Sequence, residues 1–475
     1  MSAAGRATHD RLTLCASVIA FAAAFVAGMA AQAPSSGAAP ERFAMRVVTQ
    51  GLDAPWEITW GPDGQLWVTE RRGRRVLRIG PADGAQNVAL VLPEVHQSVA
   101  QDGLLGLALH PDLLMGRQRD FVYLAFTYDD APGPAFVRRM AVRRYTFDKA
   151  TNRLGAPLDI LTGLPVGDDH LAGRLKFGPD GMLYLSLGDE GANFGGNRCN
   201  VNHAQDLPTA ADIAAKNWTS YQGKILRIAP DGSIPRDNPT IGGVRSHVFS
   251  YGHRNPQGLV FGPGGRLYES EHGPDVDDEV NLIEGGGNYG WPRVAGYRDE
   301  KSYVYANWSA SSPAPCASLP PQGRGGIPPS VPQQAESTFQ APDFKPPIQT
   351  FFTVEPATEV LRRPGNTVAP GSLDIVTGDA GVPGWKTSLL LPVMLRGLVY
   401  RMLLAPDGKS VVGGPIEYFK TTNRYRDLAV GPDQRTIYIV TDSDGATIDG
   451  NGTRTRMLAN PGAVLEFKYA GLGKD

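Results

Sequence analysis

The chain contains 475 residues, with 46 lysines and arginines against 48 aspartates and glutamates, and its formal net charge is −2. Because no basic excess is present to neutralise a phosphate backbone, this balance excludes nucleic acid as an expected partner. The 57 glycines and 39 prolines follow no Gly-X-Y repeat. This composition excludes a collagen and a coiled coil, and it favours a fold with many turns.

Residues 1–33 have the pattern of an export signal. Arg6 and Arg11 precede the apolar run 14–26, and small residues follow it. A membrane anchor is the disfavoured alternative, because the apolar run is shorter than the roughly 20 residues that a spanning helix needs. We therefore expect a cleaved signal peptide over residues 1–33, a single domain over residues 34–475, no stable membrane anchor and a periplasmic or secreted location.

A short phrase of the Pro-Asp-Gly type recurs along the chain next to β-rich runs. Its copies lie at residues 61–64, 110–112, 178–181, 262–265, 405–408 and 431–433. Proline presets φ for a turn and glycine tolerates positive φ, so each copy predicts a hairpin. Repeated hairpins predict an all-β fold of the β-propeller class, with binding and catalytic residues on long loops.

Two cysteines, Cys199 and Cys316, remain after removal of the signal. They can pair in an oxidising compartment, and two separate buried thiols are an equally weighted alternative. The segment 311–346 around the second cysteine is rich in proline, serine, glutamine and glycine. We expect an extended surface loop there, with a disordered insertion as the alternative.

Two loop segments combine histidine, arginine and carboxylate side chains. His170 follows two aspartates and precedes Asp189, and a histidine beside carboxylates can act as a general base. A structural histidine is the alternative. Arg254 and Asn255 precede an acidic run at residues 271–279, whose oxygens suit a hard cation such as Ca²⁺. The alternative for that run is a solvated acidic turn.

A third segment, at residues 421–427, carries Arg424 and Arg426 two positions apart. On a strand both side chains point to the same face, so both can bind the carboxylates of one anionic ligand. Two surface ion pairs are the alternative.

Several longer motifs point to a known family. They are Gln-Asp-Gly-Leu-Leu-Gly at 101–106, Gly-His-Arg-Asn-Pro-Gln-Gly at 252–258, Gly-Asn-Tyr-Gly-Trp-Pro at 287–292 and Asn-Arg-Tyr-Arg-Asp at 423–427. Through them the chain, from residue 52 to residue 469, resembles the soluble pyrroloquinoline-quinone-dependent glucose dehydrogenases of the glucose/sorbosone dehydrogenase family. The resemblance implies a six-bladed β-propeller with long loops on its active-site face, and pyrroloquinoline quinone (PQQ) and Ca²⁺ as cofactors.

The activity implied is that of an aldose (glucose-type) dehydrogenase, which oxidises the anomeric C1 hydroxyl to the lactone with hydride transfer to PQQ. By position, His170 matches the general base and Asp189 matches the carboxylate that orients it. Gln101 and Asp169 match residues that hold sugar hydroxyls, and Arg254 matches the residue beside the quinone oxygen. The cofactor contacts implied are Arg254, Asn255, Thr367, Arg424 and Arg426.

The resemblance also implies calcium sites. Gly273 and Pro274 match the backbone carbonyls that hold the catalytic ion. The positions implied for further ions are Glu279 and Tyr289, and Ala295, Tyr297, Asp299 and Glu336. The implied partners are an aldose substrate and a soluble electron acceptor such as a quinone, dye or cytochrome, and a homodimer is a possible assembly.

The chain departs from the family pattern at three places. Leu395 stands where the family has a PQQ-contacting lysine, and Phe194 stands where a glutamine faces the sugar. The insertion that carries two aromatic residues over the sugar is shortened to residues 358–365. Arg362 or Arg363 is expected to replace the lysine, and loss of the aromatic wall predicts a site open to other aldoses or longer saccharides.

Two other functions compete with the dehydrogenase. A calcium-dependent propeller lactonase needs a carboxylate cage at the axis and leaves the arginines without a role. A non-catalytic sugar-binding propeller is suggested only by Leu395 and Phe194. Dependence of activity on the quinone distinguishes the dehydrogenase from both.

Overall fold

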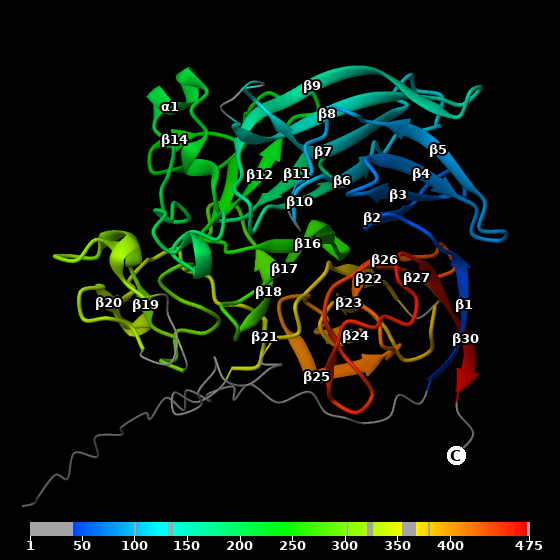
Figure 1. The fold of residues 1–475 in the computed structure, drawn as a ribbon. Helices are drawn as coiled ribbons and strands as arrows, with labels where there is room; N and C mark the ends of the chain where they lie inside the picture. The colour runs from blue at the N-terminus through cyan, green and yellow to red at the C-terminus, as the bar shows by residue number, and fades with distance from the viewer. Residues whose placement is uncertain are drawn as a thin grey trace, which may run out of the picture. The chain divides into compact units, whose positions relative to one another are not determined.

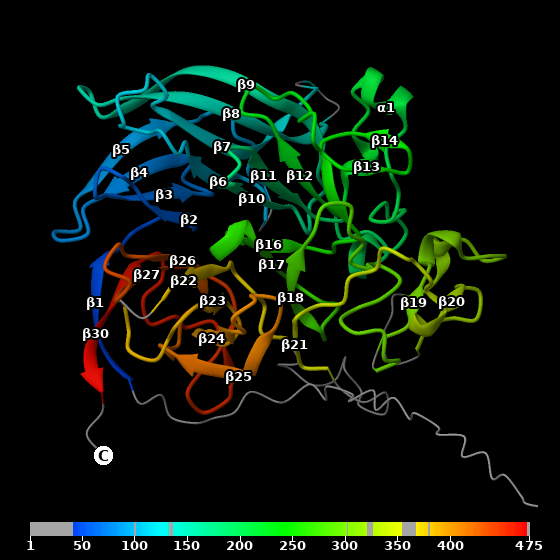
Figure 2. The same cartoon turned by 180° about the vertical axis from the view of Figure 1, so that it is seen from behind.

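The computed structural model describes residues 41–98, 101–131, 133, 136–301, 303–320, 326–353, 367–378 and 381–472. The expected signal peptide and the candidates Arg362 and Arg363 lie outside these ranges. The described residues form one compact unit. In it, six four-stranded antiparallel sheets surround a central axis (Figures 1 and 2). The predicted all-β, six-bladed β-propeller is therefore confirmed.

Each blade is an antiparallel sheet whose first strand lies at the axis. The first three blades consist of β2 (Pro55–Trp60), β3 (Leu66–Glu70), β4 (Arg75–Ile79) and β5 (Gln86–Val91); β6 (Leu104–Leu109), β7 (Phe121–Asp129), β8 (Arg138–Asp148) and β9 (Arg153–Pro165); and β10 (Ala172–Phe177), β11 (Leu183–Leu187), β12 (Lys224–Ile228) and β15 (Val248–Tyr251). The other three consist of β16 (Pro256–Phe261), β17 (Leu267–Glu271), β18 (Asp278–Ile283) and β21 (Gln349–Phe351); β22 (Asp374–Val376), β23 (Ser388–Val393), β24 (Leu398–Leu404) and β25 (Val411–Tyr418); and β26 (Tyr425–Val430), β27 (Thr436–Thr441), β30 (Val464–Leu472) and β1 (Glu41–Thr49).

The ring closes through the sixth blade, which contains both ends of the described chain. Strand β1 pairs with β30 in a register that runs from Glu41 opposite Leu472 to Thr49 opposite Val464. Figure 1 shows the two strands side by side, in blue and red. This pairing fixes the first blade beside the last one.

The described elements outside the blades are short. They are the helix α1 (Ala210–Ala215), the 3₁₀ turns η1 (Gly195–Asn197), η2 (Thr219–Tyr221), η3 (Pro263–Gly265), η4 (Trp308–Ala310), η5 (Cys316–Ser318) and η6 (Glu336–Thr338), and the strand pairs β13 (Thr240–Ile241) with β14 (Val244–Arg245), β19 (Tyr305–Ala306) with β20 (Gln333–Gln334), and β28 (Thr447–Ile448) with β29 (Arg454–Thr455). A search of the described residues finds no helix with the length and apolar character to cross a membrane.

The repeated Pro-Asp-Gly phrases lie in turns between strands, as predicted. In the copy that joins β2 to β3, the N–H of Gly61 donates to the carbonyl of Gln65 at 2.8 Å. The copies at 178–181, 262–265 and 431–433 also join the first two strands of their blades. The loops that precede each first strand, and those that join the second strand to the third, lie at the opposite ends of the strands. We call that end of the propeller the site face.

A buried network of ion pairs lies at the axis and connects the innermost strands of several blades. Arg174 on β10, with a side chain 2% exposed, donates from Nη1 to Glu57 on β2 at 2.5 Å and to Asp427 on β26 at 2.9 Å. Its Nε donates to the carbonyl of Gln257 on β16 at 2.8 Å. The guanidinium carbon lies 4.2 Å from the ring centroid of Trp56. One side chain thereby joins the first strands of four blades.

Cys199 and Cys316 form a disulfide with their Cα atoms 5.6 Å apart, which decides between the two alternatives. The bond joins the loop after β11 to the Pro-rich segment. Cys316 and Val331 of that segment pack with Trp308, which lies just before it, into one buried cluster. The segment is therefore more compact than the expected extended loop, because its apolar side chains form a small core of their own.

Candidate active site

The site residues lie on the site face, where the first strands of the blades begin. Five of these six strands start with a register shift, as between Ala172 and Leu175 on β10 and between Pro256 and Gly258 on β16. Such irregularities redirect side chains at the end of a strand. The local structure therefore turns side chains of several blades toward the axis.

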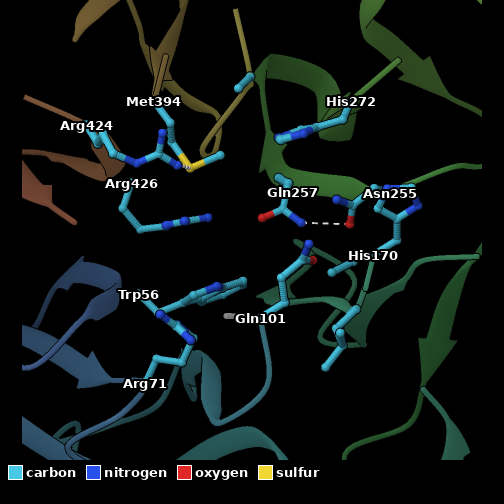
Figure 3. Close-up of a pocket in the computed structure, with 13 residues that line it drawn as sticks. Trp56, Arg71, Gln101, His170, Asn255, Gln257, His272, Met394, Arg424 and Arg426 are labelled. Carbon is cyan, nitrogen blue, oxygen red and sulfur yellow. Dashed lines mark hydrogen bonds between the residues drawn. The ribbon is translucent and has the colours of Figure 1, made fainter. Parts of the chain in front are cut away.

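A cavity of about 260 Å³ lies at the axis on this face (Figure 3). The residues that line it are Trp56, Arg71, Gln101, His170, Leu171, Ala172, Asn255, Gln257, His272, Ala369, Met394, Arg424 and Arg426. They come from all six blades. The cavity therefore exists only when the ring of blades is closed.

His170 and Asp189 form a hydrogen-bonded pair at the wall of the cavity. Nδ1 of His170 lies 2.7 Å from Oδ1 of Asp189, and both side chains are buried. Because an ionised carboxylate only accepts, the neutral imidazole carries its proton on Nδ1, and the lone pair of Nε2 can accept a proton. A Cβ at position 188 would lie 1.8 Å from the carbonyl oxygen of His170, so Gly188 permits this close approach.

Gln101 and Asp169 lie beside this pair. The side-chain amide of Gln101 donates to Oδ1 of Asp169, and Oδ2 of Asp169 lies 3.8 Å from Nε2 of His170. The Asp169 side chain is 42% exposed, so its oxygens remain accessible from solvent. The structure thus brings a donor and an acceptor next to the nitrogen that can accept a proton.

Arginines form another wall of the cavity, and Figure 3 shows Arg71, Arg424 and Arg426 on the side away from His170. Arg426 donates to both oxygens of Asp442, at 2.9 and 3.0 Å, and Nε of Arg424 donates to Oδ2 at 3.0 Å. Burial opposes ionisation of Asp442, but the charges of Arg426 and Arg424 outweigh it and hold the pKa of this carboxyl below its usual value. Burial and the charge of Arg426 lower the pKa of Arg71 to about 10. A wall with this charge attracts a ligand with several negative groups.

Arg254 and Asn255 immediately precede β16. Nη1 of Arg254 donates to the carbonyl of His272 at 3.2 Å, and its guanidinium carbon lies 5.0 Å from the ring centroid of Phe194 and 5.3 Å from that of Trp291. Its buried Nε has no hydrogen-bond partner within the described ranges. A buried donor of this kind fits a bound ligand that supplies an acceptor. Asn255 lines the cavity itself.

The loop between β17 and β18 carries the expected carbonyl donors Gly273 and Pro274. The N–H of Gly273 donates to Oδ1 of Asp278 at 3.0 Å, and a Cβ at position 273 would lie 1.8 Å from the carbonyl oxygen of Val276. The loop therefore needs glycine at this position. Thr367, expected at the cofactor, donates its hydroxyl to Oδ2 of Asp278 at 2.5 Å and is not among the residues that line the cavity.

A group of four carboxylates lies close to this loop. Its carboxylates are Asp277, Glu279, Asp299 and Glu336. Burial, together with neighbouring carboxylates, raises the pKa of Asp277, Glu279 and Glu336 to about 8. Oδ2 of Asp277 is buried, and no described residue hydrogen-bonds to it. This donor set suits a hard cation. Asp277 belongs to the acidic run at residues 271–279 and is not among the calcium positions that the family resemblance implied.

Of the other expected calcium ligands, two lie at this acidic group and one lies elsewhere. The N–H of Ala295 donates to Oε1 of Glu336 at 3.0 Å, which places Ala295 at the acidic group. Burial, and then neighbouring carboxylates, raise the pKa of Tyr297, which lies there as well. The ring of Tyr289 instead stacks on His253, with 4.7 Å between the centroids.

Several cavity residues were missed by sequence reasoning. They include Trp56, Arg71, Gln257, His272 and Met394. A signal for some of them exists, because the first or second residue after the second strand of a blade recurs at the site: Arg71, Asp189, His272, Met394 and Asp442. Arg71 supplies a positive charge to the cavity, whereas Leu395 occupies the position at which the family has a lysine.

Comparison with known proteins agrees with this architecture. A model of the family described as Glucose / Sorbosone dehydrogenase matches residues 52–315. The chain is 39% identical over 441 residues to quinoprotein glucose dehydrogenase B of Acinetobacter calcoaceticus, which covers 90% of this chain and 91% of the relative. A PQQ-bound structure of aldose sugar dehydrogenase from Streptomyces coelicolor matches 92% of this chain and 100% of that chain, with a TM-score of 0.61 and 27% identity. The chain belongs to the glucose/sorbosone dehydrogenase family.

Proposed function

We propose that this protein is an exported, PQQ- and Ca²⁺-dependent aldose dehydrogenase, which oxidises the anomeric C1 hydroxyl of a cyclic aldose to the lactone. The observation that carries the proposal is the cavity, where the His170–Asp189 pair lies opposite a wall of three arginines. Membership of the family supports the reaction class, and two relatives are named as a quinoprotein and as a PQQ-bound enzyme.

In this reaction the chain itself handles the proton and the sugar. Nε2 of His170 accepts the proton of the C1 hydroxyl, and Asp189 stabilises the imidazolium that forms. Gln101 and Asp169 hold sugar hydroxyls beside the base. When bound, PQQ supplies the acceptor for the hydride that leaves C1, and Ca²⁺ polarises this acceptor as a Lewis acid.

The arginine wall fits PQQ, which is a planar tricarboxylate. Arg71, Arg424 and Arg426 can each bind a carboxylate through charge-assisted hydrogen bonds. Asn255 supplies a neutral amide at the same cavity. The Nε of Arg254 supplies a buried donor for which the described residues offer no acceptor. A lactonase gives these cations no role, so the wall favours the dehydrogenase.

Replacing Arg71 with methionine is expected to weaken PQQ binding about 10- to 100-fold, which is the loss of one charge-assisted hydrogen bond of about 1.5–3 kcal/mol. Arg72 is the matched control, because its side chain pairs with Asp53 and Asp444 outside the cavity. Equilibrium titration with PQQ measures the affinity of both variants for the cofactor. Equal PQQ affinity for Arg71→Met and Arg72→Met would exclude Arg71 from the cofactor site.

Two cation sites fit calcium. Carbonyls of Gly273 and Pro274 would hold one ion, and Asp277, Glu279 and Glu336 would hold another. A buried carboxylate oxygen of Asp277 that receives no hydrogen bond from the described part of the chain supports the second site. Oxygen donors from side chains and backbone are the ligands that Ca²⁺ prefers.

Adding Ca²⁺ to the metal-free protein is expected to raise Tm more near pH 8.5 than near pH 6. The carboxyls of Asp277, Glu279 and Glu336 have pKa values raised to about 8, so near pH 6 the ion has to displace protons. Without the ion, the stabilisation from these raised pKa values is present at low pH and is lost as the pH rises through about 8. Calorimetry at both pH values checks this, and a Ca²⁺ effect that is independent of pH would contradict it.

Export is part of the proposal. The pattern of residues 1–33 and the Cys199–Cys316 disulfide support an oxidising compartment outside the cytoplasm. N-terminal sequencing of the protein from the periplasm or medium is expected to find a mature chain that begins after the signal.

Dye-linked oxidation of a panel of aldoses by the cofactor-free protein tests the function. Activity is expected only when PQQ and Ca²⁺ are both added, and the panel ranks the sugars. Lactone hydrolysis with Ca²⁺ alone would support the lactonase instead. Sugar binding with no turnover would support the non-catalytic propeller.

A further inference from the structure

Trp291 lies where the two functional parts of the site meet. Its indole Nε1 donates to Oδ2 of Asp189 at 2.6 Å. The same ring lies 5.3 Å, measured from its centroid, from the guanidinium carbon of Arg254. One buried side chain therefore contacts the partner of the base through its N–H and the site arginine through its aromatic face.

The hydrogen bonds of Asp189 show what the indole N–H does. Oδ1 accepts from Nδ1 of His170 at 2.7 Å and from the N–H of Gly191 at 2.9 Å. Oδ2 accepts from Asn202 at 2.9 Å and from Trp291. Donors on both oxygens fix the rotation of a carboxylate, and this carboxylate fixes the ring of His170.

The indole is itself held rigidly. The backbone N–H of Trp291 donates to the carbonyl of Gly252 at 3.0 Å, and its carbonyl accepts from Nε2 of Gln205 at 2.8 Å. Its ring packs against Tyr303, with 5.7 Å between the centroids. A side chain supported in this way can keep a neighbouring catalytic group in one geometry.

We propose that Trp291 is a positioning residue that orients both His170, through Asp189, and Arg254. Its N–H holds the carboxylate that sets the tautomer of the base, and its aromatic face holds the guanidinium by a cation–π contact. The inference rests on the proposed dehydrogenase function, because it assigns His170 the role of base.

Two variants separate the two contacts. Trp291→Phe keeps an aromatic face but removes the N–H, so kcat is expected to fall about tenfold while KM and PQQ affinity stay within about twofold. Trp291→Leu removes the aromatic face as well, so PQQ affinity is expected to fall about tenfold below that of the wild type, in addition to the loss of kcat. Trp218→Phe is the matched control, because its indole N–H donates to the carbonyl of Thr162 at 3.0 Å outside the cavity.

Nitrogen NMR of the cofactor-free protein gives a readout that does not depend on activity. With ¹⁵N-labelled histidine, His170 is expected to be the Nδ1–H tautomer in the wild type and in Trp218→Phe, and a mixture of tautomers in Trp291→Phe. Unchanged His170 shifts and unchanged kcat in Trp291→Phe would overturn the inference, as would an equal loss of kcat in Trp218→Phe. A wild-type protein without aldose activity would overturn the proposed function, while the nitrogen shifts would still decide the role of Trp291.

Discussion

Replacing His170 with asparagine is expected to lower kcat for aldose oxidation by about 10²- to 10⁴-fold, the range that a general base contributes. The amide offers no nitrogen lone pair for the C1 hydroxyl proton, so the positioned base is lost. PQQ affinity is expected to stay within about twofold, because the carboxylates of the cofactor bind the arginines. Dye reduction measures kcat, and titration of PQQ measures the affinity.

His203 provides the matched control for this substitution. Its Nδ1 lies 2.6 Å from Oδ2 of Asp206, so it forms the same type of pair outside the cavity. The variant His203→Asn is expected to keep wild-type kcat. If His170→Asn kept more than about a tenth of wild-type kcat, His170 would not be the base.

Replacing Arg174 with methionine is expected to destabilise the protein by about 3–5 kcal/mol, the cost of leaving buried carboxylates without their counter-charge. The two carboxylates are those of Glu57 and Asp427, both buried at the axis. Burial raises the pKa of Glu57 to about 7 even with Arg174 present. A raised pKa stabilises the fold at low pH and loses this effect as the pH rises, so the deficit is expected to be larger near pH 8 than near pH 5.

Urea unfolding followed by tryptophan fluorescence measures this loss at the two pH values. Arg117 is the control, because its side chain is 67% exposed in its ion pair with Asp112. Its replacement by methionine is expected to cost less than about 1 kcal/mol. Equal stability of Arg174→Met and Arg117→Met would mean that the axial network does not hold the blades together.

The fold could be predicted because its signals are local. The Pro-Asp-Gly phrases fix turns through the φ angles of their own residues, as at Gly64, whose φ is 72°, and repeated hairpins imply a propeller. The same phrases lie at the end of the blades opposite to the site face. They therefore carry no information about which residues line the cavity.

The cavity could be predicted where a motif carries several of the residues that line it, as for His170, Asn255 and the Arg424–Arg426 pair. Arg71 was missed because it meets Arg426 and Asp442 of the last blade only when β1 closes the ring. Trp291 was missed because its contact with Asp189 joins two consecutive blades through residues 102 positions apart. Thr367 is the opposite case: it was predicted to contact the cofactor, but its hydroxyl donates to Asp278 and it does not line the cavity. A position shared by the blades, directly after the second strand, was the available signal for Arg71.

Binding of PQQ at the arginine wall is tested most directly by titrating PQQ into the cofactor-free protein with Ca²⁺ present. The comparison is the triple variant Arg424→Gln, Arg426→Gln, Asp442→Asn, which keeps hydrogen-bonding amides but removes all three charges. Saturable binding to a single site is expected in the wild type, with affinity at least about 100-fold weaker in the variant. Equal affinity in the two proteins, or no saturable binding to the wild type, would contradict the assignment of this cavity to PQQ.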